Sequence, residues 1–390
     1  MANFSFFVKI TLHLGRFKNL KFIMEVKTLN EIDLSKNPII AQMGINNHEQ
    51  ILFCNDNATG LKAIIAVHNT VLGPSLGGTR FWNYNNEMEA LTDVLRLSRG
   101  MTYKSSVAGI NLGGGKAVIM GDPKKIKNEA LLRRFGKFVN SLGGKYITAE
   151  DVAMTSRDME IIKMETDYVS GLPENMGGSG DPSPVTAYGV YVSMKASAKE
   201  TWGSDSLSGK KILVQGIGHV GEVLVSHLTK DGAKVFINDI SEERLKEVST
   251  KYKAEAVSAD TMFDLDIDIY APCALGATVN EVTLSKLKCK IICGAANNQL
   301  ADEKIHGELV TKKGILYAPD FVVNAGGIIN VYYELEGYNR ERALAHAEQI
   351  YTTTFNLFQL AKKEGMPTYM AANRLGEQRI EAIARINAVL

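Results

Sequence analysis

Two lysines, Lys104 and Lys116, lie on either side of a segment of small residues that ends in three consecutive glycines. Lys104 follows an amphipathic run from Met88 to Arg99, which predicts a helix. Lys116 leads into a short apolar strand over residues 117–120. Glycine has no Cβ, so we expect a turn between the lysines that lets a ligand or a second segment come close. The two ammonium groups can converge on one small anion or carbonyl, although two solvated surface lysines explain the pair equally well.

A second chemistry-bearing pattern begins at residue 211. A buried-strand pattern over residues 211–215 leads directly into Gly-x-Gly-x-x-Gly at residues 216–221 and then into a helix. A further strand over residues 234–238 ends at Asp239. The order strand, glycine fingerprint, helix, strand and acid is typical of a dinucleotide-binding unit.

Each position of this fingerprint has its own expected task. Gly216 would make the tight turn, Gly218 would admit the pyrophosphate against the backbone, and Gly221 would let helix and strand pack closely. The N-terminus of the helix supplies N–H donors and a partial positive charge. Asp239 can accept a hydrogen bond from the ribose 2′-hydroxyl and would repel a 2′-phosphate, so the pattern favours NAD over NADP.

Composition limits the class of protein. The 390 residues carry 45% hydrophobic and 22% charged side chains and a formal charge of +1, as in an ordinary globular protein, and this balance argues against a nucleic-acid partner. Four cysteines are too few for a disulfide framework, and Cys289 and Cys293 are better interpreted as two buried thiols than as metal ligands, so no metal is expected. We find neither a membrane span nor a signal peptide and expect a cytoplasmic protein.

Alternating strand and helix patterns predict an α/β fold with two domains and a cleft between them. Glycine and proline are frequent over residues 171–184, which predicts that the boundary between the two domains lies there. We expect a substrate-binding and oligomerisation domain at residues 1–182, in which residues 1–23 are a possible extension. A doubly wound, Rossmann-type NAD domain follows at residues 183–359. The C-terminal helix within residues 360–390 would return to the first domain.

Several longer motifs resemble the glutamate/leucine/phenylalanine/valine dehydrogenase superfamily, most closely its leucine-oxidising branch. The resemblance covers roughly residues 45–390, and it is carried by Leu76-Gly-Gly-Thr-Arg80, Met101-Thr-Tyr-Lys104, Asn111-Leu-Gly-Gly-Gly-Lys116, Ile147-Thr-Ala-Glu-Asp151, Asp181-Pro-Ser-Pro-Val-Thr-Ala-Tyr-Gly-Val190, Gly294-Ala-Ala-Asn-Asn-Gln-Leu300 and Ala318-Pro-Asp-Phe-Val-Val-Asn-Ala-Gly-Gly327. It implies NAD-dependent oxidative deamination of L-leucine and other branched-chain L-amino acids to the 2-oxo acid, ammonium and NADH. It also implies a homo-oligomer, with an octamer as one possibility.

The resemblance implies roles for three charged residues. Lys104 would bind the substrate carboxylate, Lys116 would be the general base that activates water, and Asp151 would carry a proton to and from the amine. A free lysine has a pKa of about 10.4, so a lysine base working near neutrality needs a lower pKa. A second cation at Lys104 and partial desolvation would lower the pKa of Lys116, provided that Asp151 does not pair with it so tightly that the effect is cancelled.

The resemblance also places an apolar substrate slot, in which a distal carboxylate would have no partner, so that glutamate is excluded. The expected substrate-binding residues, besides Lys104, are Leu76, Gly77, Gly78, Met101, Ala149, Asn298, Ile328 and Val331. The alternatives of a valine or a phenylalanine dehydrogenase stay open, because one methylene changes specificity only modestly. A non-catalytic NAD-binding regulatory homologue would be expected to have lost Lys104, Lys116 or Asp151, and all three are present.

The expected cofactor-binding residues combine the fingerprint with the loops that follow the strands of the second domain. Ligands of doubly wound sheets lie outside the carboxyl ends of the strands. His219 is interpreted as a helix-start residue and not as a proton carrier. The full set is Thr186, Gly216, Ile217, Gly218, His219, Val220, Gly221, Glu222, Asp239, Cys273, Ala274, Asn298 and Asn324.

Overall fold

The computed structural model describes residues 8–10, 22–24, 38–274 and 276–388. It divides into two compact units, residues 1–47 and residues 48–390. In the first unit, β1 (Val8–Ile10) pairs antiparallel with β2 (Phe22–Met24), and helix α1 spans Pro38–Asn46. The remainder of the possible extension at residues 1–23 lies outside the described residues.

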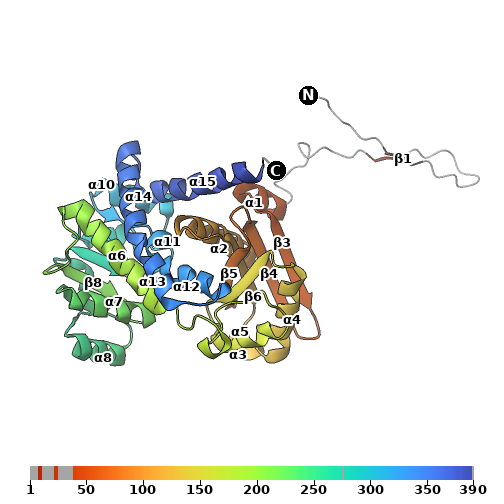
Figure 1. The fold of residues 1–390 in the computed structure, drawn as a ribbon, viewed down its shortest axis with the longest axis horizontal. Helices are drawn as coiled ribbons and strands as arrows, with labels where there is room; N and C mark the ends of the chain where they lie inside the picture. The colour runs from red at the N-terminus through yellow and green to blue at the C-terminus, as the bar shows by residue number, and fades with distance from the viewer. Residues whose placement is uncertain (1–7, 11–21, 25–37, 275, 389–390) are drawn as a thin grey trace, which may run out of the picture. The chain divides into compact units, whose positions relative to one another are not determined.

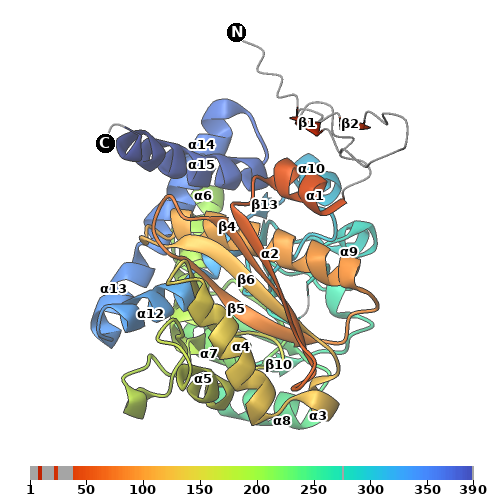
Figure 2. The ribbon, with the colours of Figure 1, turned by 90° about the vertical axis from the view of Figure 1, so that its right-hand side faces the viewer.

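A five-stranded mixed sheet opens the second unit (Figure 2). Its strands in spatial order are β3 (Gln50–Asp56), β4 (Leu61–Asn69), β6 (Gly113–Met120), β5 (Ser75–Trp82) and β7 (Tyr146–Glu150). Alternate residues of β4, including Leu61 and Ile65, pack with Leu131 and Phe135 of α4 (Glu129–Ser141). Successive side chains of a strand point to opposite faces. The other face of β4 and β6 therefore receives α2 (Glu87–Val107), which contacts both strands.

Strand β5 corrects a sequence prediction. The glycines and the proline of residues 73–80 predict a loop, but Ser75–Trp82 is a strand that pairs in parallel with both β6 and β7. A Cβ on Gly77 would lie 1.7 Å from the carbonyl oxygen of Gly115, and a Cβ on Gly78 would lie 2.2 Å from that of Glu150. The glycines thus permit close approach between strands instead of a turn. For the same reason the three glycines before Lys116 are the first residues of β6 and not a turn.

The predicted helix is present, and it extends past Arg99, so that α2 carries Lys104 in its last turn. Asn86 caps the helix by accepting a hydrogen bond from the backbone N–H of Glu89, and acidic residues occupy the first turn, where the helix dipole favours them. One stripe of the helix is buried, and it consists of Ala90, Leu91, Val94, Leu95, Ser98, Thr102, Ser105, Ser106 and Val107. This packing fixes the rotation of α2 and therefore the direction in which Lys104 projects.

A six-stranded parallel sheet follows in sequence (Figure 1). Its strands in spatial order are β10 (Glu255–Ala256), β9 (Lys234–Asn238), β8 (Lys211–Gln215), β11 (Ile269–Pro272), β12 (Ile291–Ile292) and β13 (Leu316–Tyr317). Numbered within the sheet this is the order 3-2-1-4-5-6 of a Rossmann fold. The predicted doubly wound α/β domain is confirmed, and β8 and β9 have the predicted bounds.

The helices of the second unit that accompany these sheets follow most of the predicted patterns. Besides α2 and α4, they are α3 (Pro123–Ile126), α5 (Ser156–Lys163), α6 (Ser183–Trp202), α7 (His219–Lys230), α8 (Glu242–Tyr252), α9 (Glu281–Lys286), α10 (Glu303–Lys312), α11 (Asp320–Val323), α12 (Gly326–Leu335), α13 (Arg340–Glu348), α14 (Ile350–Glu364) and α15 (Thr368–Asn387). The helical pattern over residues 342–364 predicts a single helix, but the structure has the pair α13 and α14, joined at Gln349. An asparagine at position 324 suits the N-cap of the helix that follows, but Asn324 is the C-cap of α11.

Two further features of the second unit bear on the site. Helix α15 packs against α2, the helix that carries Lys104. Glu334 of α12 binds the segment at residues 171–179: its carboxylate accepts hydrogen bonds from the backbone N–H groups of Gly171, Leu172 and Ser179, at 3.1, 3.2 and 3.0 Å, and from the hydroxyl of Ser179 at 2.8 Å.

The cysteines have the state that the sequence predicts. All four cysteines are free thiols, and Cys289 and Cys293 are buried, as predicted. Among the helices that the structure describes, none is both long and apolar enough to cross a membrane.

Candidate functional site

A cavity of about 400 Å³ brings the predicted catalytic residues together. Its walls come from β5, α2, β6, the residue after β7, the segment at residues 297–303, the start of α11 and α15. We call it the central cavity. Of the residues expected to bind substrate or to act in catalysis, those that line it are Met101, Lys104, Lys116, Asp151 and Asn298.

Lys116 and Asp151 form an ion pair at the wall of the central cavity. The Lys116 residue is only 7% exposed, and the Asp151 carboxylate also faces the Arg80 guanidinium at 3.5 Å. Burial alone would raise the pKa of Asp151, but Lys116 and Arg80 outweigh it and hold that pKa below its ordinary value. Asp151 is therefore an ionised carboxylate that is ready to accept a proton.

Arg80 is itself fixed by an ion pair with a second carboxylate. Its guanidinium donates to Asp93 of α2 at 2.9 Å, and the hydroxyl of Tyr84 donates to the same carboxylate oxygen at 2.7 Å. Burial and the neighbouring Asp93 raise the pKa of Tyr84, so the hydroxyl keeps its proton and stays a donor. The pair Arg80–Asp93 thus fixes one side of the Asp151 carboxylate. In the sequence, Arg80 stood within a motif but had no expected task.

Lys104 spans the central cavity. Its Nζ donates to Oδ1 of Asn297 at 3.3 Å, and the same oxygen accepts from Nδ2 of Asn324 at 2.7 Å. Burial and the nearby Lys116 lower the pKa of Lys104 to about 8, against the opposing attraction of Asp320 and Asp151. From the sequence, the lowered pKa was expected at Lys116. In the structure, Lys116 is the ion-pair partner of Asp151.

Asp320 is a further charged residue of the central cavity, and the sequence pattern placed it only in a loop facing the nicotinamide. One oxygen accepts from the backbone N–H of Gln299 at 3.1 Å and the other from that of Phe321 at 2.6 Å. Burial raises the pKa of Asp320, although the Gln299 hydrogen bond and Lys104 act in the opposite direction. Asp320 follows β13 and Asn297 follows β12, so both lie at the carboxyl ends of parallel strands. That position is the signal that could have identified both residues.

The expected apolar slot lies mostly beside the central cavity. Leu76 and Ile328, 3% and 6% exposed, belong to one apolar cluster against which the half-buried Met101 and Val331 pack. Met101 belongs to that cluster and also lines the cavity. The remaining expected residues, Gly77, Gly78 and Ala149, are buried in β5 and β7. An apolar surface thus adjoins the lysines and the carboxylate.

The fingerprint at residues 216–221, which we call the dinucleotide turn, has the geometry that a bound dinucleotide requires. Gly216 has φ +92°, and a Cβ there would lie 2.6 Å from Ala274; a Cβ on Gly221 would lie 2.0 Å from the carbonyl oxygen of Gly216. By contrast, a Cβ on Gly218 would meet nothing within 4 Å. Gly218 is the N-cap of α7 and makes no side-chain cap hydrogen bond, so no side chain caps the first N–H groups of this helix. The residues fit a pyrophosphate.

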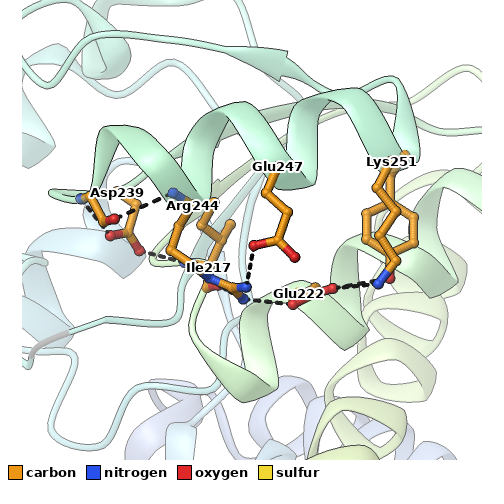
Figure 3. A network of polar contacts seen from close by, with 8 residues as sticks. Ile217, Glu222, Asp239, Arg244, Glu247 and Lys251 are labelled. Carbon is orange, nitrogen blue, oxygen red and sulfur yellow. Dashed lines mark hydrogen bonds and ion pairs between the residues drawn. The ribbon is translucent and has the colours of Figure 1, made fainter.

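Asp239 closes the other side of the dinucleotide turn (Figure 3). One carboxylate oxygen accepts from the backbone N–H of Ile217 at 2.8 Å and the other from that of Ser241 at 2.9 Å. These bonds orient the carboxylate at the end of β9, where the sequence pattern predicts the adenosine ribose.

The other expected cofactor residues are placed as follows. Asn324 donates to the carbonyl oxygen of Ala295 at 2.9 Å, and its own Oδ1 is buried with no hydrogen-bond partner among the described residues, which suits a carboxamide donor. Thr186 donates to the carbonyl of Pro182 at 2.9 Å. Cys273 and Ala274 follow β11 beside Gly216. His219 and Val220 are the first residues of α7, and the Glu222 carboxylate is bound by Arg244 and Lys251.

Comparisons with known proteins agree with this geometry. A family model described as "Glu/Leu/Phe/Val dehydrogenase, dimerisation domain" matches residues 48–168, and one described as "Glutamate/Leucine/Phenylalanine/Valine dehydrogenase" matches residues 177–241 and 236–386. The leucine dehydrogenase of Geobacillus stearothermophilus is 55% identical over 339 residues, which cover 87% of this chain and 92% of that protein. The chain belongs to this dehydrogenase family.

Other relatives share the family but differ in their named substrates. Valine dehydrogenase of Streptomyces virginiae is 49% identical over 336 residues, 85% of this chain and 94% of that protein. The crystal structure of L-tryptophan dehydrogenase from Nostoc punctiforme has a TM-score of 0.80 at 44% identity and covers 89% of this chain and 99% of that chain. The resemblance inferred from the motifs is confirmed, and so is the fold: an N-terminal α/β domain with a Rossmann-type domain.

Proposed function

We propose that this chain is an NAD-dependent L-leucine dehydrogenase. It would convert L-leucine, NAD⁺ and water to 4-methyl-2-oxopentanoate, ammonium, NADH and a proton. The observation that carries the proposal is the meeting of Lys104, Lys116 and Asp151 in one cavity beside an apolar cluster. The identity of 55% to a leucine dehydrogenase, against 49% to a valine dehydrogenase, favours leucine among the branched-chain substrates.

Lys104 would bind the substrate carboxylate, because it is a half-buried ammonium group whose partner Asn297 is neutral. Fixing the carboxylate at Lys104 turns the α-amino group toward Asp151 and Lys116. A bound NAD⁺ would supply the hydride acceptor, and we propose that the dinucleotide turn, Asp239 and Asn324 hold it.

Asp151 would take the proton that the amino group must lose before hydride leaves Cα. Its lowered pKa keeps it ionised, so it is in the accepting form at neutral pH. Protonation of Asp151 removes the counter-charge of Lys116, while the Arg80 guanidinium beside Asp151 keeps its positive charge. That change favours loss of a proton from Lys116, which can then draw a proton from the water that attacks the imino carbon. The tight pair in this structure is therefore compatible with a later base at Lys116.

The slot would select the side chain by exclusion of charge. Leu76, Met101, Ile328 and Val331 offer no partner to a distal carboxylate. Burying an unpaired carboxylate costs on the order of several kcal/mol, because the lost hydration is not replaced, so glutamate is rejected. Valine and isoleucine differ from leucine by a methylene or a branch, and a methylene is worth about 1–3 kcal/mol. We therefore expect overlap onto both.

The proposal extends to organisation. We propose the division into residues 1–182, 183–359 and 360–390, and a homo-oligomer. The family description of residues 48–168 as a dimerisation domain supports an assembly of two or more chains. A cytoplasmic location and an octamer stay predictions.

A substrate panel tests the function. NADH formation is followed by its absorbance with L-leucine, L-valine, L-isoleucine, L-phenylalanine and L-glutamate at alkaline pH, and kcat/KM should be highest for leucine and undetectable for glutamate. Faster turnover of valine or phenylalanine would replace leucine by that substrate. NADH binding without turnover of any amino acid would instead indicate the regulatory homologue.

A further inference from the structure

A network of polar contacts outside the central cavity surrounds Arg244 on α8 (Figure 3). Its guanidinium donates to Glu222 of α7 at 2.6 Å and to Glu247 at 2.8 Å. Glu222 in turn accepts from Lys251 at 2.9 Å and from the hydroxyl of Tyr252 at 3.3 Å. We call these residues, together with Asp239, the Arg244 cluster. Two of the three carboxylates thus engage the one guanidinium directly.

The Arg244 cluster lies at the dinucleotide turn. The guanidinium donates to the carbonyl oxygen of Ile217 at 3.1 Å, while the N–H of the same residue donates to Asp239 at 2.8 Å. Arg244 and Asp239 therefore flank one residue of the turn. A group bound at Asp239, where the ribose 2′ position is expected, would have Arg244 as a neighbouring cation.

The charges of the cluster keep the guanidinium occupied. Hydrogen bonds from Lys251 and Arg244 lower the pKa of Glu222 to about 2, so this carboxylate is anionic throughout the working pH range. Arg244 is always protonated, and its planar donors suit a phosphate as well as a carboxylate. A 2′-phosphate that approached Arg244 would meet the carboxylates of Glu222 and Glu247, whose charges already offset that of the guanidinium, as well as Asp239.

We propose that Arg244 is a specificity-determining residue for the dinucleotide, withheld from a 2′-phosphate by Glu222 and Glu247. Cofactor preference then depends on two features: Asp239 repels the 2′-phosphate, and Glu222 occupies the cation that would otherwise bind it. The inference rests on the proposed dinucleotide site and concerns which dinucleotide that site takes. It predicts that removing Asp239 alone relaxes the preference only in part.

The experiment measures binding and not turnover. Dissociation constants of NADH and NADPH are obtained for the full chain by fluorescence titration of the reduced nicotinamide. The variants are Asp239→Ala, Glu222→Gln, their combination, and that combination with Arg244→Ala. A charge-assisted hydrogen bond changes affinity by about tenfold or more. We expect Asp239→Ala to weaken NADH about tenfold and to tighten NADPH several-fold, and Glu222→Gln to tighten NADPH about tenfold further in the Asp239→Ala background.

Adding Arg244→Ala to the double variant should abolish the gain for NADPH and change NADH affinity by less than about twofold. Lys251→Gln is the matched control: it removes another cation from Glu222 without freeing Arg244, so NADPH affinity should not rise. Should Arg244→Ala fail to fold, as judged by its melting curve, Arg244→Lys replaces it and should lose most of the gain, because lysine lacks the planar donor pair.

The outcomes separate this inference from the proposed function. A double variant that gains NADPH affinity and keeps it after removal of Arg244 would overturn the role of Arg244. A wild-type chain that binds NADH, with a double variant that gains nothing for NADPH, would overturn the inference alone. A wild-type chain that binds neither NADH nor NADPH would overturn both the inference and the proposed function.

Discussion

The central cavity contains charged side chains that pair across segments distant in the sequence. The dinucleotide turn is instead shaped by the backbone and by the absence of side chains at its glycines. In the cavity, Lys116 of β6 meets Asp151 after β7, and Lys104 of α2 meets Asn297 after β12. In the turn, the space for a ligand is set by what Gly216, Gly218 and Gly221 lack.

The two regions therefore differ in what one substitution removes. When a charged side chain is removed from the central cavity, its partner is left as an unpaired charge in a poorly solvated place. We expect the turnover rate to fall, while the structure of the dinucleotide turn stays unchanged. A side chain added to the dinucleotide turn collides with main chain, which cannot move aside cheaply, unless it points into the ligand space. The contrast can be tested by asking whether chemistry and cofactor binding fail separately.

Lys116→Ala should have the largest effect. Loss of a general base lowers kcat by about 10²- to 10⁴-fold, while NADH binding should change little because the dinucleotide turn is untouched. Stopped-flow or steady-state turnover of leucine and NADH fluorescence titration measure the two. Lys127→Ala is the matched control, because Lys127 pairs with Asp158 at 2.8 Å outside the cavity. Retention of most activity in Lys116→Ala would remove this residue from its proposed role.

Gly218→Ala and Gly221→Ala form a pair that tests the dinucleotide turn. At Gly218 the new methyl points into open space, so the melting temperature should hold while NADH affinity falls; at Gly221 it meets the Gly216 carbonyl at 2.0 Å, so both should fall. Overpacking at Gly221 should lower the free energy of unfolding by about 1–3 kcal/mol. A clash of the same size with bound NADH at Gly218 would raise its dissociation constant roughly 5- to 150-fold. Melting curves and NADH titrations give the two quantities. Equal losses of stability in both variants would contradict the open space at Gly218.

Lys104 predicts a pH dependence of carboxylate binding. Its pKa is lowered to about 8, so the ammonium is present below that pH and is lost as the pH rises through it. The dissociation constant of 4-methyl-2-oxopentanoate, measured with NADH and without ammonium, should rise up to about tenfold for each further pH unit once the pH exceeds that pKa. Lys104→Arg should flatten this rise, because arginine keeps its charge. An unchanged pH profile in Lys104→Arg would show that another group controls binding.

Val331→Ala should have the smallest effect. Val331 is half-buried against the apolar cluster that adjoins Met101, so shortening it enlarges the slot without touching the charges. The ratio of kcat/KM for phenylalanine to that for leucine should rise by about threefold to tenfold, the low end of effects in apolar pockets. Val279→Ala, at a fully buried valine of another core cluster, should lower stability and leave the ratio unchanged. A fixed ratio in Val331→Ala would place this residue outside the slot.

The Rossmann-type half was readable from sequence because its signals are local. The strands at residues 211–215 and 234–238 coincide with β8 and β9, since a buried apolar run bounded by a glycine turn and an acid allows few other structures. The first sheet was less readable. Its glycines at residues 77–78 and 113–115 have the composition of turns, yet they are strand residues at close contacts within the sheet. Composition does not distinguish these two uses of glycine.

The candidate site could be predicted as a set of residue types but not as a set of partners. The motifs supplied Lys104, Lys116 and Asp151, but only the fold brings Lys104 to Asn297, 193 positions away along the chain. The lowered pKa of Lys104 likewise depends on burial and on neighbours from other elements. Arg244 was missed for a similar reason. It belongs to no motif, and only the fold brings its guanidinium to the carbonyl oxygen of Ile217 and to the carboxylate of Glu222.

Glu334 stabilises a segment that has little regular structure of its own. Its carboxylate accepts hydrogen bonds at both ends of residues 171–179, from the backbone N–H of Gly171 and from the backbone and hydroxyl of Ser179. Removing that carboxylate would leave these donors without their acceptor on α12, and an unpaired buried donor costs about 1–3 kcal/mol. A single acidic side chain, more than 150 positions away along the chain, thus fastens this segment to α12.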